Sequence, residues 1–305
     1  KRTLFFGAIE FGLSYDPMKK LGLIDSLKLG LYRKLIFSKW KEALGGRVRL
    51  IASGSAALQP RLSRVFWAAG IPVSEGYGLT ETSPIISISK VNPPDFQVGC
   101  VGSVLDCVEV KIAEDGEILA KGDSIMPGYY KNPEATAEAI DKDGWFHTGD
   151  IGVFVDGKYL KITDRKKEIF KTSGGKYIVP QAMENRLKQS RFIEQAMVIG
   201  EGEKFPAVFI VPNFAFVKEW ALRHNLDFSQ LSNDEIIANQ SLIDRIDKEI
   251  SEINLEYGSW EQLKKVKLLP QEFTIEGGEL TPTLKFKRKK ILEKYQAQYQ
   301  AIYSA

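Results

Sequence analysis

Residues 71–82 read Ile-Pro-Val-Ser-Glu-Gly-Tyr-Gly-Leu-Thr-Glu-Thr, in which a short apolar run leads into a polar loop with two glycines. A similar order occurs just upstream, where residues 48–52 form an apolar run that Ser-Gly-Ser interrupts at 53–55. Residues 61–69 between the two loops suit a helix. Strand, loop, helix, strand and loop make an α/β unit, and ligands of open α/β sheets bind where such strands end. The sequence therefore predicts an α/β fold with a ligand site at these two loops.

Upstream of this unit, residues 18–44 predict a helical region with basic residues interleaved. The apolar residues at spacings near three and four are Leu23, Ile24, Leu27, Leu31, Leu35 and Trp40. A helix packed on a core is the first interpretation of such spacing. A helix lying on a membrane surface is the alternative.

Downstream, residues 98–163 have mostly strand character, with hairpin signatures at Asp115-Gly116 and Asp156-Gly157 and a short helix expected from Pro133. After the charged residues 164–167 the pattern becomes α+β. Strands are expected at 196–199 and 207–211, and isoleucines at helical spacing follow from Ile243. We therefore predict two domains, 1–165 and 166–305, each of ordinary independent size.

Composition agrees with about two domains and excludes several classes of protein. The chain has 305 residues, 44% of them hydrophobic, and a net charge of +3, which requires neither nucleic acid nor an anionic membrane as partner. Two cysteines, Cys100 and Cys107, and two histidines argue against a disulfide framework and a multi-histidine metal centre. We find no run of about 18 apolar residues and no basic-then-apolar leader, so no spanning helix or signal peptide is expected. The sparse cysteines fit a reducing cytoplasm, and peripheral membrane association is a further expectation.

Three groups with complementary chemistry fall within five residues of the 77–82 loop. The Tyr77 ring could stack on a purine, an interaction worth about 1–3 kcal/mol per base in single-strand binders. The Thr80 hydroxyl could bind a phosphate. The Glu81 carboxylate could hold Mg²⁺, which usually binds one or two carboxylates together with substrate phosphates. One nucleotide could meet all three.

Three more segments carry polar side chains that suit the same ligand. Asp150 ends a His-Thr-Gly-Asp segment at 147–150 and, at the start of a strand, could accept hydrogen bonds from both ribose hydroxyls. Residues 164–176 are basic and close in a glycine turn. Lys285 follows a Thr-Pro-Thr loop. His147 is expected to be structural, because this chemistry needs no imidazole.

In this order and at these separations, the four segments resemble the AMP-forming adenylating superfamily of acyl- and aryl-CoA synthetases, firefly luciferase and nonribosomal-peptide adenylation domains. The resemblance runs from about Arg47 to the end of the chain. Residues 1–46 and the Glu-Leu-Thr-Pro-Thr-Leu-Lys segment at 279–285 resemble the long-chain fatty acyl branch. The implied fold is the C-terminal part of a large AMP-binding domain, followed by a small mobile α+β domain.

The resemblance implies a role for each matching residue. In the larger domain, the residues implied to bind the nucleotide, the acyl group or Mg²⁺ are Gly54, Ser55, Ala56, Tyr77, Gly78, Thr80, Glu81 and Asp150. Among these, Tyr77 would stack on adenine, Thr80 would bind phosphate, and Glu81 would bind Mg²⁺. Asp150 would hold the ribose.

The remaining roles fall around and beyond the domain boundary. Arg165 would assist at the ribose, Lys167 would be the hinge, and Lys171 would support the adenylation geometry. Ser173, Gly174 and Gly175 would border the thiol tunnel. Lys285 would bridge the acyl carboxylate and the α-phosphate.

The implied activity is ATP-dependent conversion of a long-chain fatty acid to acyl-AMP and then to acyl-CoA, with ATP/AMP, Mg²⁺ and coenzyme A as cofactors. The family's upstream phosphate loop, approximately Thr-Ser-Gly-Thr-Thr-Gly-x-Pro-Lys-Gly, is not found. Residues 172–176 only look similar, because Tyr177 stands where a Walker loop requires Ser or Thr. We therefore expect the chain to be an incomplete, inactive C-terminal portion of its parent enzyme.

Two other functions remain open: loading of an acyl group onto a carrier protein, and a non-catalytic nucleotide-binding module. The basic cluster at 285–290 is expected to be a solvated helix face and not a nucleic-acid site.

Overall fold

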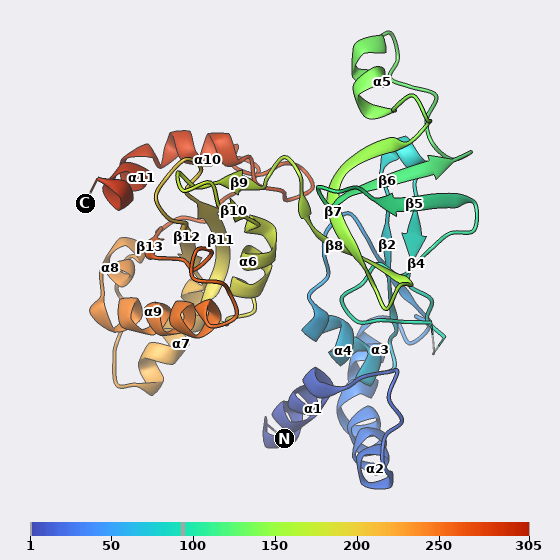
Figure 1. The fold of residues 1–305 in the computed structure, drawn as a ribbon. Coiled ribbons are helices and arrows are strands. Elements are labelled where there is room, and N and C mark those ends of the chain that lie inside the picture. Colours follow the sequence, from blue (N-terminus) through green and yellow to red (C-terminus); the bar gives the residue numbers. More distant parts are fainter. Residues whose placement is uncertain (1, 93–94, 305) are drawn as a thin grey trace. The chain divides into compact units, whose positions relative to one another are not determined.

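The computed structural model describes residues 2–92 and 95–304, and the chain divides into two compact units. Unit 1 is Lys1–Thr163 and unit 2 is Asp164–Ala305. Each unit has its own hydrophobic clusters. Both kinds of structure predicted from the sequence, α/β and α+β, are present (Figure 1).

The centre of unit 1 is an eight-stranded mixed sheet whose last strand, β8, ends at Arg165. β1 and β2 pair in parallel, whereas β2, β3 and β4 pair antiparallel. In spatial order the strands are β1 (Ile51–Ser53), β2 (Val73–Tyr77), β3 (Ser87–Ile88), β4 (Ser103–Val104), β8 (Tyr159–Arg165), β7 (Phe146–Val155), β6 (Glu117–Gly122) and β5 (Val108–Ile112). The parallel pair β1–β2 is the α/β unit predicted from the two glycine loops.

The helices of unit 1 include the predicted region near residues 18–44, which is helical from Leu23 to Ala43. It consists of α2 (Leu23–Tyr32), a π-helical turn (Arg33–Phe37) and α3 (Ser38–Ala43). The other helices are α1 (Arg2–Ser14), α4 (Pro60–Ala68) and α5 (Pro133–Ala139). Proline at the first position of α4 and α5 suits a helix start, because that N–H has no helical partner.

Helix α1 was not predicted from the sequence. Its aromatic and glycine residues have low helix propensity, so its helical conformation depends on packing against the rest of unit 1. Gly12 lets α1 approach α4 closely, since a Cβ at this position would lie 3.2 Å from Cγ2 of Val65.

Unit 2 is built on a three-stranded sheet that is covered on both faces. Alternate residues of β12 (Ala207–Pro212) enter different clusters: Val208 and Ile210 face one core, and Phe209 and Val211 face the other. This is the period-two alternation of a strand buried on both sides. The sheet is completed by β11 (Ile193–Ile199) and β13 (Lys265–Leu268), and a separate hairpin pairs β9 (Phe170–Lys171) with β10 (Tyr177–Ile178).

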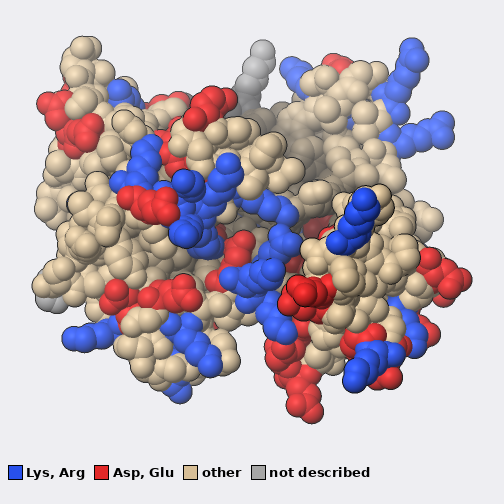
Figure 2. Space-filling model, turned by 90° about the horizontal axis from the view of Figure 1, so that it is seen from above, with Lys and Arg blue, Asp and Glu red and all other residues tan. Residues whose placement is uncertain are grey.

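The helices of unit 2 surround this sheet. They are α6 (Pro180–Leu187), α7 (Phe214–Arg223), α8 (Asn233–Ile237), α9 (Gln240–Asn254), α10 (Arg288–Lys294) and α11 (Gln296–Tyr303). Within the described residues, no helix is both long enough and apolar enough to cross a bilayer. Figure 2 shows that basic and acidic side chains are interspersed on the face in view.

Candidate functional site

Tyr77 and Asp150, which are 73 residues apart in the sequence, are in contact within unit 1. The Tyr77 hydroxyl donates a 2.8 Å hydrogen bond to Oδ2 of Asp150. Tyr77 is buried and Asp150 is half-buried. A purine stacked near Tyr77 would therefore bring its ribose within reach of the Asp150 carboxylate.

The strands extend further than the sequence indicated at both residues. Tyr77 was placed in a loop, but it is the last residue of β2, where it pairs with Ser87 of β3. Asp150 was placed at the start of a strand, but β7 begins four residues earlier, at Phe146. Cross-strand pairing, which the local sequence does not reveal, accounts for the Tyr77 difference.

The loop at Gly54, Ser55 and Ala56 lies beside β2. β1 ends at Ser53, which is paired with Glu75, and a Cβ at Gly54 would lie 3.4 Å from the carbonyl oxygen of Gly76. Ser55 has φ 65°, the left-handed region that non-glycine residues rarely adopt. Strained backbone of this kind is concentrated at ligand sites. The structure thus places both glycine loops next to each other.

Gly78 is required by the turn that follows Tyr77. A Cβ at this position would lie 1.7 Å from the carbonyl oxygen of Pro84, a distance that excludes any side chain. Residues Thr80–Thr82 form a short 3₁₀ turn, in which Thr80 is exposed and Glu81 is half-buried. The turn therefore presents a hydroxyl and a carboxylate on adjacent residues.

The Glu81 side chain has a hydrogen-bond partner that the sequence did not indicate. Its Oε1 accepts a 3.0 Å hydrogen bond from the Tyr129 hydroxyl. Burial, with a further contribution from Glu81, raises the pKa of Tyr129. The Glu81 carboxylate suits Mg²⁺ that also binds substrate phosphates, because this ion usually takes only one or two protein carboxylates. Within residues 2–92 and 95–304, no cluster of three His, Cys, Asp or Glu forms an all-protein metal site.

Glu75 is a buried acid that sequence reasoning missed. It lies on the same face of β2 as Tyr77, and its Oε1 has no hydrogen-bond partner in the described structure. Burial raises the pKa of Glu75 to about 7, and a hydrogen bond from the backbone of Leu58 opposes that rise. The available signal was an acid two residues before Tyr77, so that a strand would turn both side chains to one face.

The segment around the predicted hinge, Lys167, is anchored within unit 2. Asp164 is fully buried and accepts hydrogen bonds from the backbone N–H groups of Arg165 and Gln181, the second at 3.0 Å. Burial raises the pKa of Asp164 to about 6, although both hydrogen bonds oppose the rise. Arg165 is the last residue of β8, so Lys167 lies in the turn just beyond a fixed strand end.

Arg288 joins this segment to the segment that carries Lys285. Its Nη2 donates to Glu184 at 2.8 Å and to Glu168 at 3.2 Å, and its Nη1 donates to the carbonyl oxygen of Val198 at 3.1 Å. Burial raises the pKa of Glu184 to about 7, and the Arg288 charge opposes the rise. The prediction of a solvated face at 285–290 is therefore wrong for Arg288, because this guanidinium is mostly buried.

The other predicted residues of unit 2 lie on exposed loops and on the β9–β10 hairpin. Lys171 ends β9, and its Nζ lies 4.7 Å from the centre of the Tyr177 ring. Gly174 and Gly175 form the turn between β9 and β10, where Gly175 has φ 74°. Lys285 is exposed, and its backbone N–H donates a 3.0 Å hydrogen bond to Oγ1 of Thr281. The structure thus brings predicted residues together in unit 1, at Tyr77 and Asp150, whereas Lys285 and the residues of the β9–β10 hairpin have separate partners in unit 2.

Comparison with known proteins identifies both parts of the chain. The family described as "AMP-binding enzyme" matches residues 24–130, and the one described as "AMP-binding enzyme C-terminal domain" matches residues 167–305. The chain belongs to the AMP-binding enzymes. This membership was predicted from the order of the four motifs and is confirmed.

Among curated relatives, long-chain-fatty-acid–CoA ligase FadD15 of Mycobacterium bovis is 38% identical over 283 residues, which are 93% of this chain and 46% of the relative. Long-chain-fatty-acid–CoA ligase 1 of Homo sapiens is 35% identical over 289 residues, 90% of this chain and 41% of the relative. The chain thus spans less than half the length of these relatives.

Solved structures share the fold. The A domain of carboxylic acid reductase from Segniliparus rugosus, in complex with AMP and a co-purified carboxylic acid, has a TM-score of 0.67 at 22% identity and matches 99% of this chain and 46% of that one. The corresponding domain from Mycobacterium chelonae has a TM-score of 0.68 at 22% identity, over 100% of this chain and 46% of that one. The predicted fold class of an adenylate-forming enzyme is confirmed.

His147 contacts Glu117 and not any predicted ligand group. Its Nδ1 lies 3.0 Å from Oε2 of Glu117, whose Oε1 accepts a 3.0 Å hydrogen bond from the Gly149 backbone. These contacts fix the backbone just before Asp150, which is a structural role.

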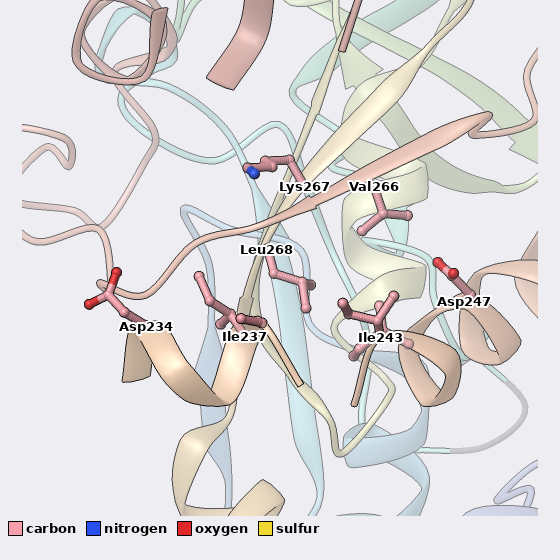
Figure 3. Close-up of a pocket in the computed structure, with 9 residues that line it drawn as sticks. Asp234, Ile237, Ile243, Asp247, Val266, Lys267 and Leu268 are labelled. Carbon is pink, nitrogen blue, oxygen red and sulfur yellow. The ribbon is translucent and has the colours of Figure 1, made fainter. Parts of the chain in front are cut away.

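Unit 2 also has an apolar pocket that contains none of the predicted residues (Figure 3). It has a volume of about 280 Å³ and lies between α8, α9 and β13. Ile237, Ile243 and Leu268 line it, with Asp234 and Asp247 on opposite sides.

Proposed function

We propose that the chain is part of an AMP-forming long-chain fatty-acid–CoA ligase, which converts a fatty acid, ATP and CoA to acyl-CoA, AMP and pyrophosphate. The observation that supports the proposal is the Tyr77–Asp150 hydrogen bond, which joins an aromatic ring that could stack on adenine to a carboxylate that could accept from a ribose. The relatives at 35–38% identity are long-chain-fatty-acid–CoA ligases, which indicates the substrate class.

In this proposal the residues of unit 1 hold the nucleotide. Tyr77 stacks on adenine, and Asp150 accepts hydrogen bonds from the ribose hydroxyls. The loop at 54–56 lines the adenine and acyl pocket beside them. Thr80 donates to phosphate, and Glu81 would hold Mg²⁺, which neutralises phosphate charge when bound.

Unit 2 supplies the groups that act during the two half-reactions. A carboxylate is a poor electrophile, and the mixed anhydride with AMP gives it a leaving group. Negative charge develops at the α-phosphate during attack, so the Lys285 ammonium would stabilise it electrostatically. Arg165 assists at the ribose, and Lys171 supports the adenylation geometry.

Lys285 and Gly174 lie on different loops of the same unit, and we assign them to different half-reactions. Lys285 serves adenylate formation, and residues 173–175 border the thiol path. Rotation of the smaller domain would bring the two groups to the site in turn, and domain motions of this kind are common in enzymes. Lys167 is the proposed hinge for that rotation, at the boundary between domains 1–165 and 166–305.

The location of the protein is also part of the proposal. We place it in the cytoplasm, with peripheral attachment to membranes through the helical region at 18–44. Long-chain fatty acids are strongly apolar, so contact with a bilayer would bring the enzyme close to its substrate.

The test is fatty-acid-dependent pyrophosphate release, measured for the full-length parent and for the 305-residue chain. We expect turnover by the parent with palmitate, ATP and CoA, and none by the 305-residue chain. A parent that shows no fatty-acid-dependent release would overturn the proposed activity. Release with a carrier protein but not with CoA would identify the carrier-loading alternative, and AMP binding without turnover by the parent would identify a non-catalytic module.

A further inference from the structure

Helix α2 has two apolar faces, of which only one is packed. Leu29 is buried on the inner face, in the cluster that includes Ala8 and Phe37. The opposite face carries Leu23, Ile24, Leu27, Leu31 and, in the following turn, Leu35. These five residues, here called the α2 stripe, recur at the spacing of one helix face.

The α2 stripe is exposed to solvent along its whole length. The exposed fractions are 87% for Leu23, 70% for Ile24 and 76% for Leu27, with Leu31 at 50%. A contiguous apolar surface of this kind usually marks an interaction site, because its hydration is unfavourable. α2 and α5 lie at opposite ends of unit 1 (Figure 1).

Charge distribution indicates what covers the stripe. Residues 16–43 contain seven Lys or Arg and three Asp or Glu, a net charge of +4, whereas the rest of the chain has 35 basic and 36 acidic residues. Exposed lysines adjoin the stripe: Lys19, Lys20, Lys28, Lys34 and Lys39. Two of them, Lys19 and Lys28, have acidic neighbours, Asp16 and Asp25, at 3.8 and 3.7 Å. The positive charge of the whole chain is thus concentrated around its most exposed apolar helix.

We propose that the α2 stripe docks on an anionic lipid bilayer, with α2 lying in the interface and the lysines at the headgroups. Amphipathic helices bind in this way through apolar burial and attraction to anionic lipid. A second copy of the chain fits less well, because a symmetric contact would bring two positive surfaces together. The inference identifies the residues through which the proposed membrane attachment would occur. It holds whether or not the proposed adenylating activity is correct.

The experiment is vesicle flotation of the 305-residue chain without ATP, with phosphatidylcholine vesicles that contain or lack 30% phosphatidylserine. We expect binding to the anionic vesicles that weakens as salt is raised, because exposed charges are screened. The variant Leu23→Gln/Ile24→Gln/Leu27→Gln should bind at least tenfold more weakly. The matched control, Leu222→Gln/Leu255→Gln, removes two leucines of unit 2 that are 62% and 85% exposed and should bind like the wild type.

Three outcomes would overturn the inference. The first is a wild type that binds the anionic vesicles no better than the triple variant does. The second is a wild-type dimer in sedimentation that the triple variant abolishes without any vesicle binding, which would assign the stripe to a second copy. The third is a full-length parent whose vesicle binding the triple variant leaves unchanged, which would show that the rest of the protein covers the stripe. Circular dichroism of each variant verifies folding, and pyrophosphate release by the parent reports separately on the proposed function.

Discussion

Unit 1 and unit 2 hold their candidate residues in different ways. In unit 1, Tyr77 is buried in a strand and its hydroxyl bonds directly to Asp150. In unit 2, Lys285 and Gly174 are exposed on loops, and the fixed group is Arg288, three residues beyond Lys285. A preformed surface suits a ligand that stays in place, whereas exposed side chains on an anchored loop suit groups that act in only one step. Four substitutions test this contrast, in order of expected effect.

The largest effect is expected for Lys285→Ala in the full-length parent. Adenylate formation should fall about 100-fold to 1,000-fold, the usual cost of one electrostatic stabiliser of the transition state. Thioester formation from preformed acyl-adenylate should be spared, as measured by CoA-dependent AMP release. Lys289→Ala, at another exposed lysine, is the control. Equal loss in both half-reactions would contradict the division of roles within unit 2.

Arg288→Met tests the anchor of unit 2. The substitution leaves Glu184 buried without its ion-pair partner, so the free energy of unfolding should fall by about 3 kcal/mol at pH 8. Because burial raises the Glu184 pKa to about 7, this carboxyl can protonate in acid, and the loss should be smaller at pH 5. Urea unfolding at both pH values measures this. Glu184→Gln added to the variant should restore part of the stability, and a loss that is independent of pH would refute the explanation.

Glu75→Gln tests the buried acid beneath the unit 1 loops. Its pKa is raised to about 7, so the folded state favours the protonated form, and that contribution to stability is lost as pH rises from about 4.5 through 7. The variant should match the wild type near pH 5 and exceed its free energy of unfolding by about 2 kcal/mol at pH 8. Glu114→Gln, at an exposed position, should show no such difference. Parallel pH profiles for wild type and Glu75→Gln would exclude this role.

The smallest effects are expected at the Tyr77–Asp150 pair, where Asp150→Asn keeps the shape of the side chain but removes its charge. AMP affinity of the full-length parent should fall about tenfold, equivalent to about 1.4 kcal/mol. Tyr77→Phe keeps the ring and should cost less than Asp150→Asn. Calorimetry with AMP measures both, with Asp156→Asn as a control at an exposed turn. Unchanged AMP affinity in Asp150→Asn would contradict the view that unit 1 is a preformed nucleotide site, because Asp150 would then not contact the ribose.

The sequence predicted most of the helices and strands, because their patterns are local. The helix at Pro133 and the parallel pair β1–β2 follow from proline placement and apolar runs. Helix α1 could not be predicted, since its packing on α4 depends on contacts about 50 residues away. Likewise, the extension of β2 to Tyr77 depends on pairing with Ser87.

For the site, motif order indicated the residue types but not their partners. Nothing near Glu81 in the sequence indicates Tyr129, and Arg288 looks like one more basic residue in a run of lysines. Tyr129 is 48 positions from Glu81, and Arg288 is 104 positions from Glu184. Only the folded chain therefore identifies these two pairs. The roles assigned to the site residues of both units, from Tyr77 and Asp150 to Lys285, stay predictions.

The 1.7 Å approach at Gly78 has a consequence for genetics. Every replacement of Gly78 would place a Cβ against the Pro84 carbonyl and disrupt the turn. A library of all 19 replacements in the full-length parent should therefore yield no active enzyme. The neighbouring Thr80, exposed to solvent, should accept serine. Such a library would locate the turn in any homologue without a structure.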